Sequence, residues 1–200
     1  MLFYKYRFSL GMHERLKKHL SKFADPLEED LGSLSKVLRP VKVKKKDFLL
    51  RQGQICKYKY FVVSGFFRMY FINDKGVEKT INFSIEDWWL ADFDSFGNQT
   101  KTHLFIQAVE DAEVLGVSRS DLEEVLTKSL ELNRYFRAVG ERVRIADQRR
   151  IEYISDLSGK DLYRIFQSLN PDFVQRVPQY MLASYLGVTP EFLSKVRGLK

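Results

Sequence analysis

The sequence has one cysteine, three histidines and no long apolar run, and each shortage excludes a class of protein. A single thiol, Cys56, cannot form an internal disulfide or a four-thiolate metal or iron–sulfur site, and an unbridged cysteine suits a reducing cytoplasm. His13 and His19 fall in one predicted N-terminal helix and His103 stands alone, so a metal triad is not expected. No apolar run approaches the ~18 residues of a membrane helix. We therefore expect a cytoplasmic protein with no membrane partner.

Motifs for catalysis are missing as well. The chain contains no G-x-S-x-G, H-E-x-x-H or Walker A pattern. An enzyme or metal protein on a cupin-like barrel would need clustered His and Glu, which three separated histidines do not supply. We predict that the protein is not an enzyme, and we identify no cofactor or metal from its sequence.

What the chain does contain is apolar and basic. Its 200 residues are 44% hydrophobic and 14% aromatic, enough for one large domain or two small ones. The net charge of +7 favours a polyanionic partner. Residues 1–11 are aromatic and basic and lack the apolar core of a signal peptide. Met12 precedes an amphipathic helix, 13–23, so we expect Met12 to be the natural start and residues 1–11 a poorly ordered extension.

The middle of the chain is predicted to be β. Short apolar or alternating runs are separated by turn residues, and Ser64-Gly65 and Asn73-Asp74-Lys75-Gly76 are typical of hairpins. About seven short strands in succession favour a small antiparallel roll of the jelly-roll (double-stranded β-helix) type, which often encloses one small ligand. The predicted strands are 41–43, 47–50, 58–63, 66–72, 79–83, 103–108 and 113–117.

Helices are predicted to follow the roll. Ser120-Asp121-Leu122-Glu123 is a capping box that starts helix 121–126, and Ser158-Gly159-Lys160-Asp161 caps another helix through Leu169. Between them, a long helix from about 130 to 154 carries an apolar seam at alternating spacings of four and three, as in a two-stranded coiled coil. This helix either pairs two copies of the chain or packs on its own barrel. The seam residues are Leu132, Phe136, Val139, Val143, Ala146, Arg150 and Tyr153.

The last part of the chain has the spacing of a helix, a tight turn and a second helix. Pro178 can open the first helix, Gly187 can end it, and Thr189 with Pro190 can start the second. Phe192, Leu193 and Val196 are expected to face the core. Residues 176–200 carry four basic side chains and one acidic side chain, so their charge is 4 − 1 = +3. This pattern indicates a DNA-reading helix-turn-helix, with 173–177 as one strand of a wing; a helical hairpin in a core is the alternative.

The order of β-roll, long helix and helix-turn-helix resembles the Crp/Fnr family of bacterial transcription regulators, from about Met12 on. Gln52-Gly53 with 60–70 is similar to the family's glycine-punctuated hairpins, and 108–115 to the strand pair that closes the roll. Glu191-Phe192-Leu193-Ser194-Lys195 is similar to the E-x-x-S-R reading motif of Fnr-type members, with Lys in place of Arg. The implied fold is α+β: a sensor roll at 1–128, a dimerisation helix at 129–155 and a winged helix-turn-helix at 156–200.

The resemblance implies a homodimer that reads an inverted repeat in double-stranded DNA, with RNA polymerase as a candidate partner. Glu191 can accept from cytosine N4, and Lys195 can donate to guanine as a point charge. Ser194 can contact a base edge or a phosphate, and the start of the second helix can bind a phosphate. The predicted DNA-contacting residues are Gln179, Thr189, Pro190, Glu191, Ser194, Lys195 and Arg197.

The sensor departs from the family pattern. Cyclic-nucleotide members carry G-E-L-A followed by R-S/T-A-T, in which the Arg meets the cyclic phosphate. Residues 87–104 contain no G-E pair and place Thr102 at the position of that Arg. Lys101 and His103 could donate to a phosphate, but three nearby carboxylates oppose an anion. The chain has too few cysteines for an iron–sulfur cluster, and a haem could use only His103 or Cys56 as an axial ligand. The effector is therefore unknown, and cAMP is not expected. The candidate pocket is Trp88, Trp89, Asp92, Lys101, Thr102 and His103.

The rival function is a barrel that binds a cyclic nucleotide or another small ligand and uses its helix-turn-helix for protein interaction. Salt dependence separates the two functions, because DNA binding releases counterions and weakens steeply with added salt.

Overall fold

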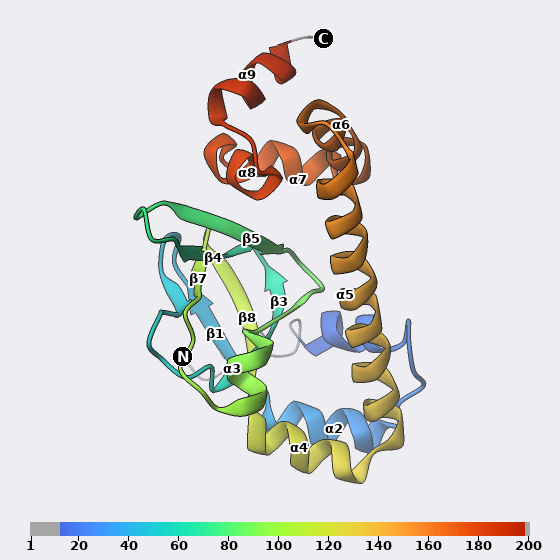
Figure 1. The fold of residues 1–200 in the computed structure, drawn as a ribbon. Coiled ribbons are helices and arrows are strands. Elements are labelled where there is room, and N and C mark those ends of the chain that lie inside the picture. The colour runs from blue at the N-terminus through green and yellow to red at the C-terminus, as the bar shows by residue number, and fades with distance from the viewer. Residues whose placement is uncertain (1–12, 199–200) are drawn as a thin grey trace. The chain divides into compact units, whose positions relative to one another are not determined.

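The computed structural model describes residues 13–198, which form two compact units (Figure 1). Within this range, the sensor unit contains 13–69 and 83–140, and the helical unit contains 70–82 and 141–198. The proposed start at Met12 and the extension 1–11 lie outside the described residues. None of the described helices is both long and apolar enough to span a membrane.

The β-roll consists of two four-stranded antiparallel sheets. Their strand orders are β1-β8-β3-β6 and β2-β7-β4-β5. In the first sheet, Arg39 pairs with Gly116, and Tyr60 pairs with both Gly116 and Leu90. All seven predicted runs coincide with strands, and β6 is an additional short strand. The bounds are β1 Arg39–Val43, β2 Phe48–Leu50, β3 Tyr58–Ser64, β4 Phe67–Ile72, β5 Glu78–Ser84, β6 Trp89–Leu90, β7 Phe105–Ala108 and β8 Ala112–Ser118.

The predicted hairpin turns are confirmed. Gly65 has a φ of 78°, and a Cβ there would lie 2.6 Å from the carbonyl oxygen of Asp111, so the turn into β4 requires glycine. In the turn before β5, the side-chain oxygen of Asn73 accepts from the amides of Lys75 and Val77 at 3.1 and 3.0 Å. Side chain and backbone together therefore determine the register of the β4–β5 hairpin.

Helices cover one part of the sensor unit. Residues 13–20 are helical, and α2 (Glu28–Val37), which was not predicted, packs beside α4 (Arg119–Lys128). The cap of α4 is Ser118, whose hydroxyl accepts from the amide of Asp121 at 3.1 Å. The predicted cap, Ser120, lies inside the helix. The prediction was wrong because Ser118 and Ser120 each have an acidic residue three positions later, Asp121 and Glu123, and only one serine can start the helix.

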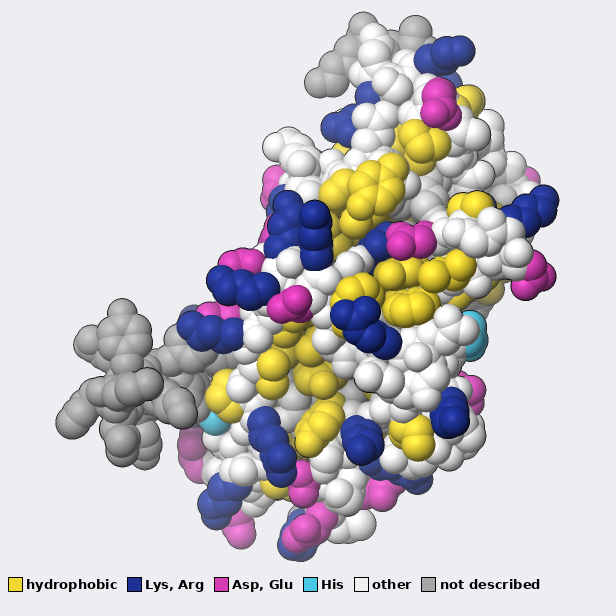
Figure 2. Space-filling view, turned by 90° about the vertical axis from the view of Figure 1, so that its left-hand side faces the viewer, with side chains coloured by type: hydrophobic (Ala, Val, Ile, Leu, Met, Phe, Trp, Pro, Cys, Tyr) yellow, Lys and Arg dark blue, Asp and Glu magenta, His cyan; other side chains and the backbone are white. Residues whose placement is uncertain are grey.

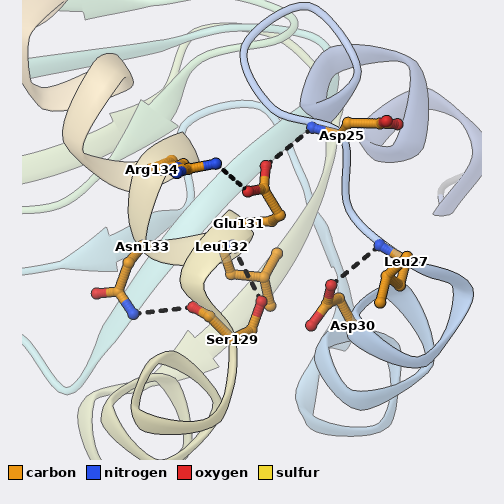
Figure 3. Close-up of polar contacts among 8 residues, drawn as sticks. All are labelled: Asp25, Leu27, Asp30, Ser129, Glu131, Leu132, Asn133 and Arg134. Atoms are coloured by element: carbon orange, nitrogen blue, oxygen red, sulfur yellow. Dashed lines mark hydrogen bonds and ion pairs between the residues drawn. The ribbon is translucent and has the colours of Figure 1, made fainter.

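The long helix α5 (Leu130–Asp156) is anchored where it begins, as Figure 3 shows. Ser129 accepts from the amide of Leu132 at 3.1 Å through its hydroxyl, and from the side chain of Asn133 at 2.9 Å through its carbonyl. Glu131 accepts from the amide of Asp25 at 3.1 Å and forms an ion pair with Arg134. These contacts fix the first turn of α5 on the sensor unit.

The helical unit ends in four short helices. They are α6 Gly159–Leu169, α7 Pro171–Arg176, α8 Gln179–Leu186 and α9 Pro190–Gly198. The predicted cap of α6 is confirmed, since Ser158 accepts from the amide of Asp161. The predicted wing strand at 173–177 was wrong, because these residues belong to α7. Asn170 and Pro171 start this helix, with Pro171 in its first turn, where proline needs no hydrogen-bond partner.

Candidate nucleic-acid interface and effector site

The helix-turn-helix is set by local features at Gly187 and Thr189. Gly187 has a φ of 71° and ends α8 in the left-handed conformation, with its amide directed at the carbonyls of Ala183 and Ser184. Thr189 starts α9, because its hydroxyl oxygen accepts from the amide of Phe192 at 3.1 Å. Both predicted caps are confirmed, so the sequence itself sets the turn between the two helices.

The core beneath these helices is apolar and closely packed. Leu182, Ala183 and Leu193 are completely buried. At Gly159, the first residue of α6, a Cβ would lie only 2.6 Å from a methyl carbon of Val188, so α6 closely approaches the turn. Phe192, predicted to face the core, is 40% exposed even though its ring lies beside Gly159. The absence of a Cβ at Gly159 leaves room for this ring.

The outer surface of α9 carries most of the predicted DNA-contacting residues. Glu191, Ser194, Lys195 and Arg197 are exposed, as are Thr189 and Pro190 at the start of the helix. Within residues 13–198, the side chains of Ser194 and Lys195 form no hydrogen bond or ion pair. Their polar groups are therefore available to an external partner.

Gln179 has an internal contact. Its amide nitrogen donates to the carbonyl of Pro190 at 3.0 Å and thereby joins the start of α8 to the start of α9. The sequence predicts Gln179 as a contact to the DNA backbone. The structure gives it a positioning contact within the helix-turn-helix.

One face of the molecule carries charges of both signs. On the face in Figure 2, Lys and Arg side chains alternate with Asp and Glu and with exposed hydrophobic side chains. This face therefore shows no continuous basic patch, and the case for a nucleic-acid partner depends on the exposed residues of α9.

In the sensor unit, Asp92 and Thr102 form a buried pair. They are 7% and 4% exposed, and the Thr102 hydroxyl donates to the Asp92 carboxylate. The other carboxylate oxygen of Asp92 accepts from the amide of Ser95 and caps α3 (Phe93–Asn98). The Thr102 oxygen accepts from the amide of Leu104 at 2.9 Å. The pair therefore satisfies its own hydrogen bonds, and its buried carboxylate does not fit a cyclic phosphate.

The two other carboxylates of this segment also have local partners. Asp87 forms an ion pair with Arg15 at 2.6 Å, and Asp94 accepts from the side chain of Asn98 at 2.7 Å. The carboxylates of this acidic segment thus form contacts that stabilise α3 and the helical residues 13–20.

The remaining residues of the predicted effector pocket are not gathered in one place. Trp89 is buried and donates to the hydroxyl of Tyr135 at 2.7 Å, whereas Trp88 is 39% exposed. Lys101 is exposed and lines a cleft of about 550 Å³ beside β3, and His103 is exposed. Of the six residues predicted for the effector pocket, the structure therefore brings together only Asp92 and Thr102.

Sequence reasoning missed Lys59, a half-buried lysine of β3. Its ammonium lies 5.6, 5.3 and 5.5 Å from the ring centres of Phe93, Phe96 and Phe136. Burial lowers the pKa of Lys59, while the three rings favour the charged form. No local signal could have shown this, because the rings come from α3 and α5, far from β3 in the sequence.

Cys56 is a core thiol. It is 2% exposed, and its thiol lies 3.3 Å from the carbonyl of Tyr58. Burial raises the pKa of this thiol, so the neutral form is favoured. Among residues 13–198, no group of three or more His, Cys, Asp or Glu is placed to hold a metal ion.

The predicted seam of α5 is not a continuous exposed stripe. Leu132 is completely buried in the sensor unit, and the Phe136 ring lies 5.0 Å from Trp89. Towards the other end of α5, Arg150 and Tyr153 line a cavity with residues of α6 and α8. An apolar heptad pattern does not specify its partner, and both ends of this seam contact elements of their own subunit. Ile145 and Ile151, outside the predicted seam, are 50% and 67% exposed.

Comparison with known proteins supports the fold. Residues 40–129 match the family model for the cyclic nucleotide-binding domain. No curated protein sequence matches the chain.

Similar solved structures include FixK2 from Bradyrhizobium japonicum, with a TM-score of 0.68 at 18% identity over 81% of this chain and 83% of that one. The c-di-GMP-responsive global regulator CLP from Xanthomonas campestris also has a TM-score of 0.68, at 17% identity over 85% of this chain and 89% of that one. The sensor domain of the transcriptional regulator DNR from Pseudomonas aeruginosa has a TM-score of 0.56 at 22% identity, over 76% of this chain and 98% of that one. Residues 40–129 thus match the cyclic nucleotide-binding domain family, and the chain shares its fold with solved regulators that include one described as of the Crp/Fnr family.

Proposed function

We propose that the protein is a cytoplasmic, DNA-binding transcription regulator that acts as a homodimer and is not an enzyme. The observation that carries the proposal is the helix-turn-helix, whose second helix exposes polar side chains above a buried apolar core. The similar structures are described as transcriptional or global regulators, which supports the same function.

In this proposal, α9 enters the major groove. Glu191 accepts from a cytosine amino group, and Lys195 donates to a guanine edge. The first-turn amides of α9, preceded by Thr189, bind a phosphate, and Arg197 contributes a further backbone contact. Gln179 holds the start of α9 against α8 and so fixes the angle at which the helix meets the groove.

The homodimer follows from the need for two reading helices about one helical turn of DNA apart. The exposed apolar residues along α5, including Ile145 and Ile151, are the surface that we assign to the second copy. The effector, if the roll binds one, would shift the equilibrium between two arrangements of the dimer. The internally bonded pair of Asp92 and Thr102 argues against cAMP as that effector.

Selection from a randomised duplex library at two salt concentrations tests the proposal. We expect enrichment of an inverted repeat with ~10 bp between half-site centres and affinity that falls steeply with salt. Glu191→Gln should relax the preference at one base pair of each half-site at a cost of about 1–3 kcal/mol. Glu29→Gln, an exposed substitution in α2, is the matched control. A salt-insensitive protein that selects no sequence would contradict the proposal and favour a protein-interaction role for the helix-turn-helix.

A further inference from the structure

The helical unit contains a cavity that DNA reading does not use. Its volume is about 300 Å³, and it lies between the second half of α5, α6 and α8. The volume is at the lower end of the range for small-molecule pockets. Most of its wall is apolar, with contributions from Ile154, Leu162, Ile165, Phe166 and Leu186. The cavity can therefore remove a compact apolar group from water.

Arg150 supplies a cation to this apolar wall. The guanidinium carbon lies 4.3 Å from the ring centre of Tyr185, and Nη2 donates to the carbonyl of Tyr185 at 3.2 Å. The Nε atom of Arg150 is buried, and no group among the described residues accepts its proton. Arg150 as a whole is half-buried, but a buried N–H without an acceptor costs free energy. The one carbonyl and one ring beside it do not supply that acceptor.

The charged side chains that line the cavity have one sign. Arg149 and Arg150 line it, and its lining contains no carboxylate. Asp147, one turn before Arg150 on α5, interacts with it electrostatically, but no described carboxylate lies within ion-pair distance of Arg150. Burial raises the pKa of Asp147, while the charge of Arg150 opposes that shift. The two lining cations therefore favour an anion, and Asp147 outside the lining opposes them only in part.

We propose that this cavity binds a small organic anion, in which a compact apolar body carries one carboxylate or sulfonate, with Arg150 as the partner of the anionic group. The apolar walls match the body, and the unmet hydrogen bond of the guanidinium matches the anion. A polyphosphate is disfavoured, since the apolar lining cannot satisfy several charges. The site lies outside the β-roll, and its ligand would contact α8, the first helix of the helix-turn-helix.

A matched pair of fluorescent probes tests the proposal on the full chain. 8-Anilinonaphthalene-1-sulfonate has an apolar body with one sulfonate, and N-phenyl-1-naphthylamine has the same body without the charge. We expect saturable binding of the sulfonate at one site per chain. Arg150→Gln should weaken it at least about tenfold and change the neutral probe little. Arg144→Gln, an exposed change on the same helix, should leave both affinities unaltered.

Methyl NMR of the unmodified protein locates the probe and does not depend on the folding of any variant. The sulfonate should shift the methyl signals of Ile154 and Ile165, which line the cavity, and leave that of Ile106 in the roll unchanged. Shifts at Ile106 without shifts at Ile154 and Ile165 would overturn the proposal. An equal loss of affinity for both probes in Arg150→Gln would also overturn it. The same holds if the sulfonate does not bind the unmodified chain.

Discussion

Helix α9, the proposed reading helix, and segment 87–104 of the sensor unit, the cassette, use their polar residues in opposite ways. On α9, Ser194 and Lys195 are exposed and form no hydrogen bond or ion pair within the part of the chain that the structure describes. In the cassette, Asp92 and Thr102 are buried and bonded to each other and to nearby amides. The polar groups of α9 remain able to bond to a partner, whereas those of the cassette are already bonded within the fold.

This difference shows where a family resemblance can be carried from fold to function. On a helix whose apolar face is buried, the outward residues are free to take the role that their positions have in the family. At a buried position, the same reasoning fails, because a neighbour can take the hydrogen bonds that a ligand would use. The reading motif therefore supports DNA binding, while the cassette does not support a cyclic phosphate.

The largest expected effect comes from breaking the core beneath the reading helix. Leu193→Ala removes a completely buried side chain and should lower the free energy of unfolding of the helical unit by about 2–5 kcal/mol. Thermal unfolding monitored by far-UV circular dichroism measures the loss of helix, and DNA affinity should fall with it. Tyr180→Ala, at a 55% exposed position of α8, is the control with little expected change. Equal melting temperatures for Leu193→Ala and the unmodified chain would show that Leu193 does not hold α9.

A smaller effect is expected when the cassette pair is broken. Thr102→Val keeps the side-chain shape but removes the hydroxyl, which leaves the Asp92 carboxylate without that donor and the Leu104 amide without its acceptor. Such unmet groups should cost about 1–3 kcal/mol of unfolding free energy. Urea unfolding monitored by tryptophan fluorescence reports on this unit, because Trp88 and Trp89 both lie in it.

Thr100→Val is the matched control for the cassette, since Thr100 is exposed and two residues away. If Thr102→Val were as stable as this control, the pair would not be a structural element. Its polar groups would then be available to an effector, and the contrast with α9 would disappear.

The sequence predicts the elements whose causes are local. Gly187 and Thr189 act within a few residues of themselves, so the turn between α8 and α9 follows from the residues alone. The β-runs are equally local, because alternation and Ser64-Gly65 define the hairpin. The apolar content of 173–177 indicated a strand, but Pro171 and its neighbours start a helix there. Competing local signals of similar strength limit such predictions.

The candidate site was less predictable because it depends on pairings between distant residues. Asp92 and Thr102 are separated in the sequence by α3 and the loop that follows it. Their spacing does not indicate the hydrogen bond between them. The seam of α5 predicts which face of the helix is covered, and at Leu132 and Phe136 that cover comes from the sensor unit. Periodicity gives the buried face of a helix and not the identity of what covers it.

The smallest expected effect concerns the cation held by three rings in the sensor unit. Burial lowers the pKa of Lys59 below its ordinary value of 10.5. Between the folded and unfolded pKa values the unfolded chain binds more protons, so the free energy of unfolding rises with pH across that window. Lys59→Met removes this titration, and the stability of the variant relative to the unmodified chain should therefore decline as the pH rises.

Urea unfolding between neutral pH and about pH 10 measures this difference. Lys57→Met, at an exposed lysine two residues away, controls for the loss of a positive charge. A relative stability of Lys59→Met that does not change with pH would mean that ring contacts fully compensate for burial. In that case the sensor unit would stabilise its half-buried lysine as fully as it stabilises Asp92. The half-buried Arg150 of the helical unit, whose Nε has no acceptor among the described residues, would then be the group that still lacks a partner.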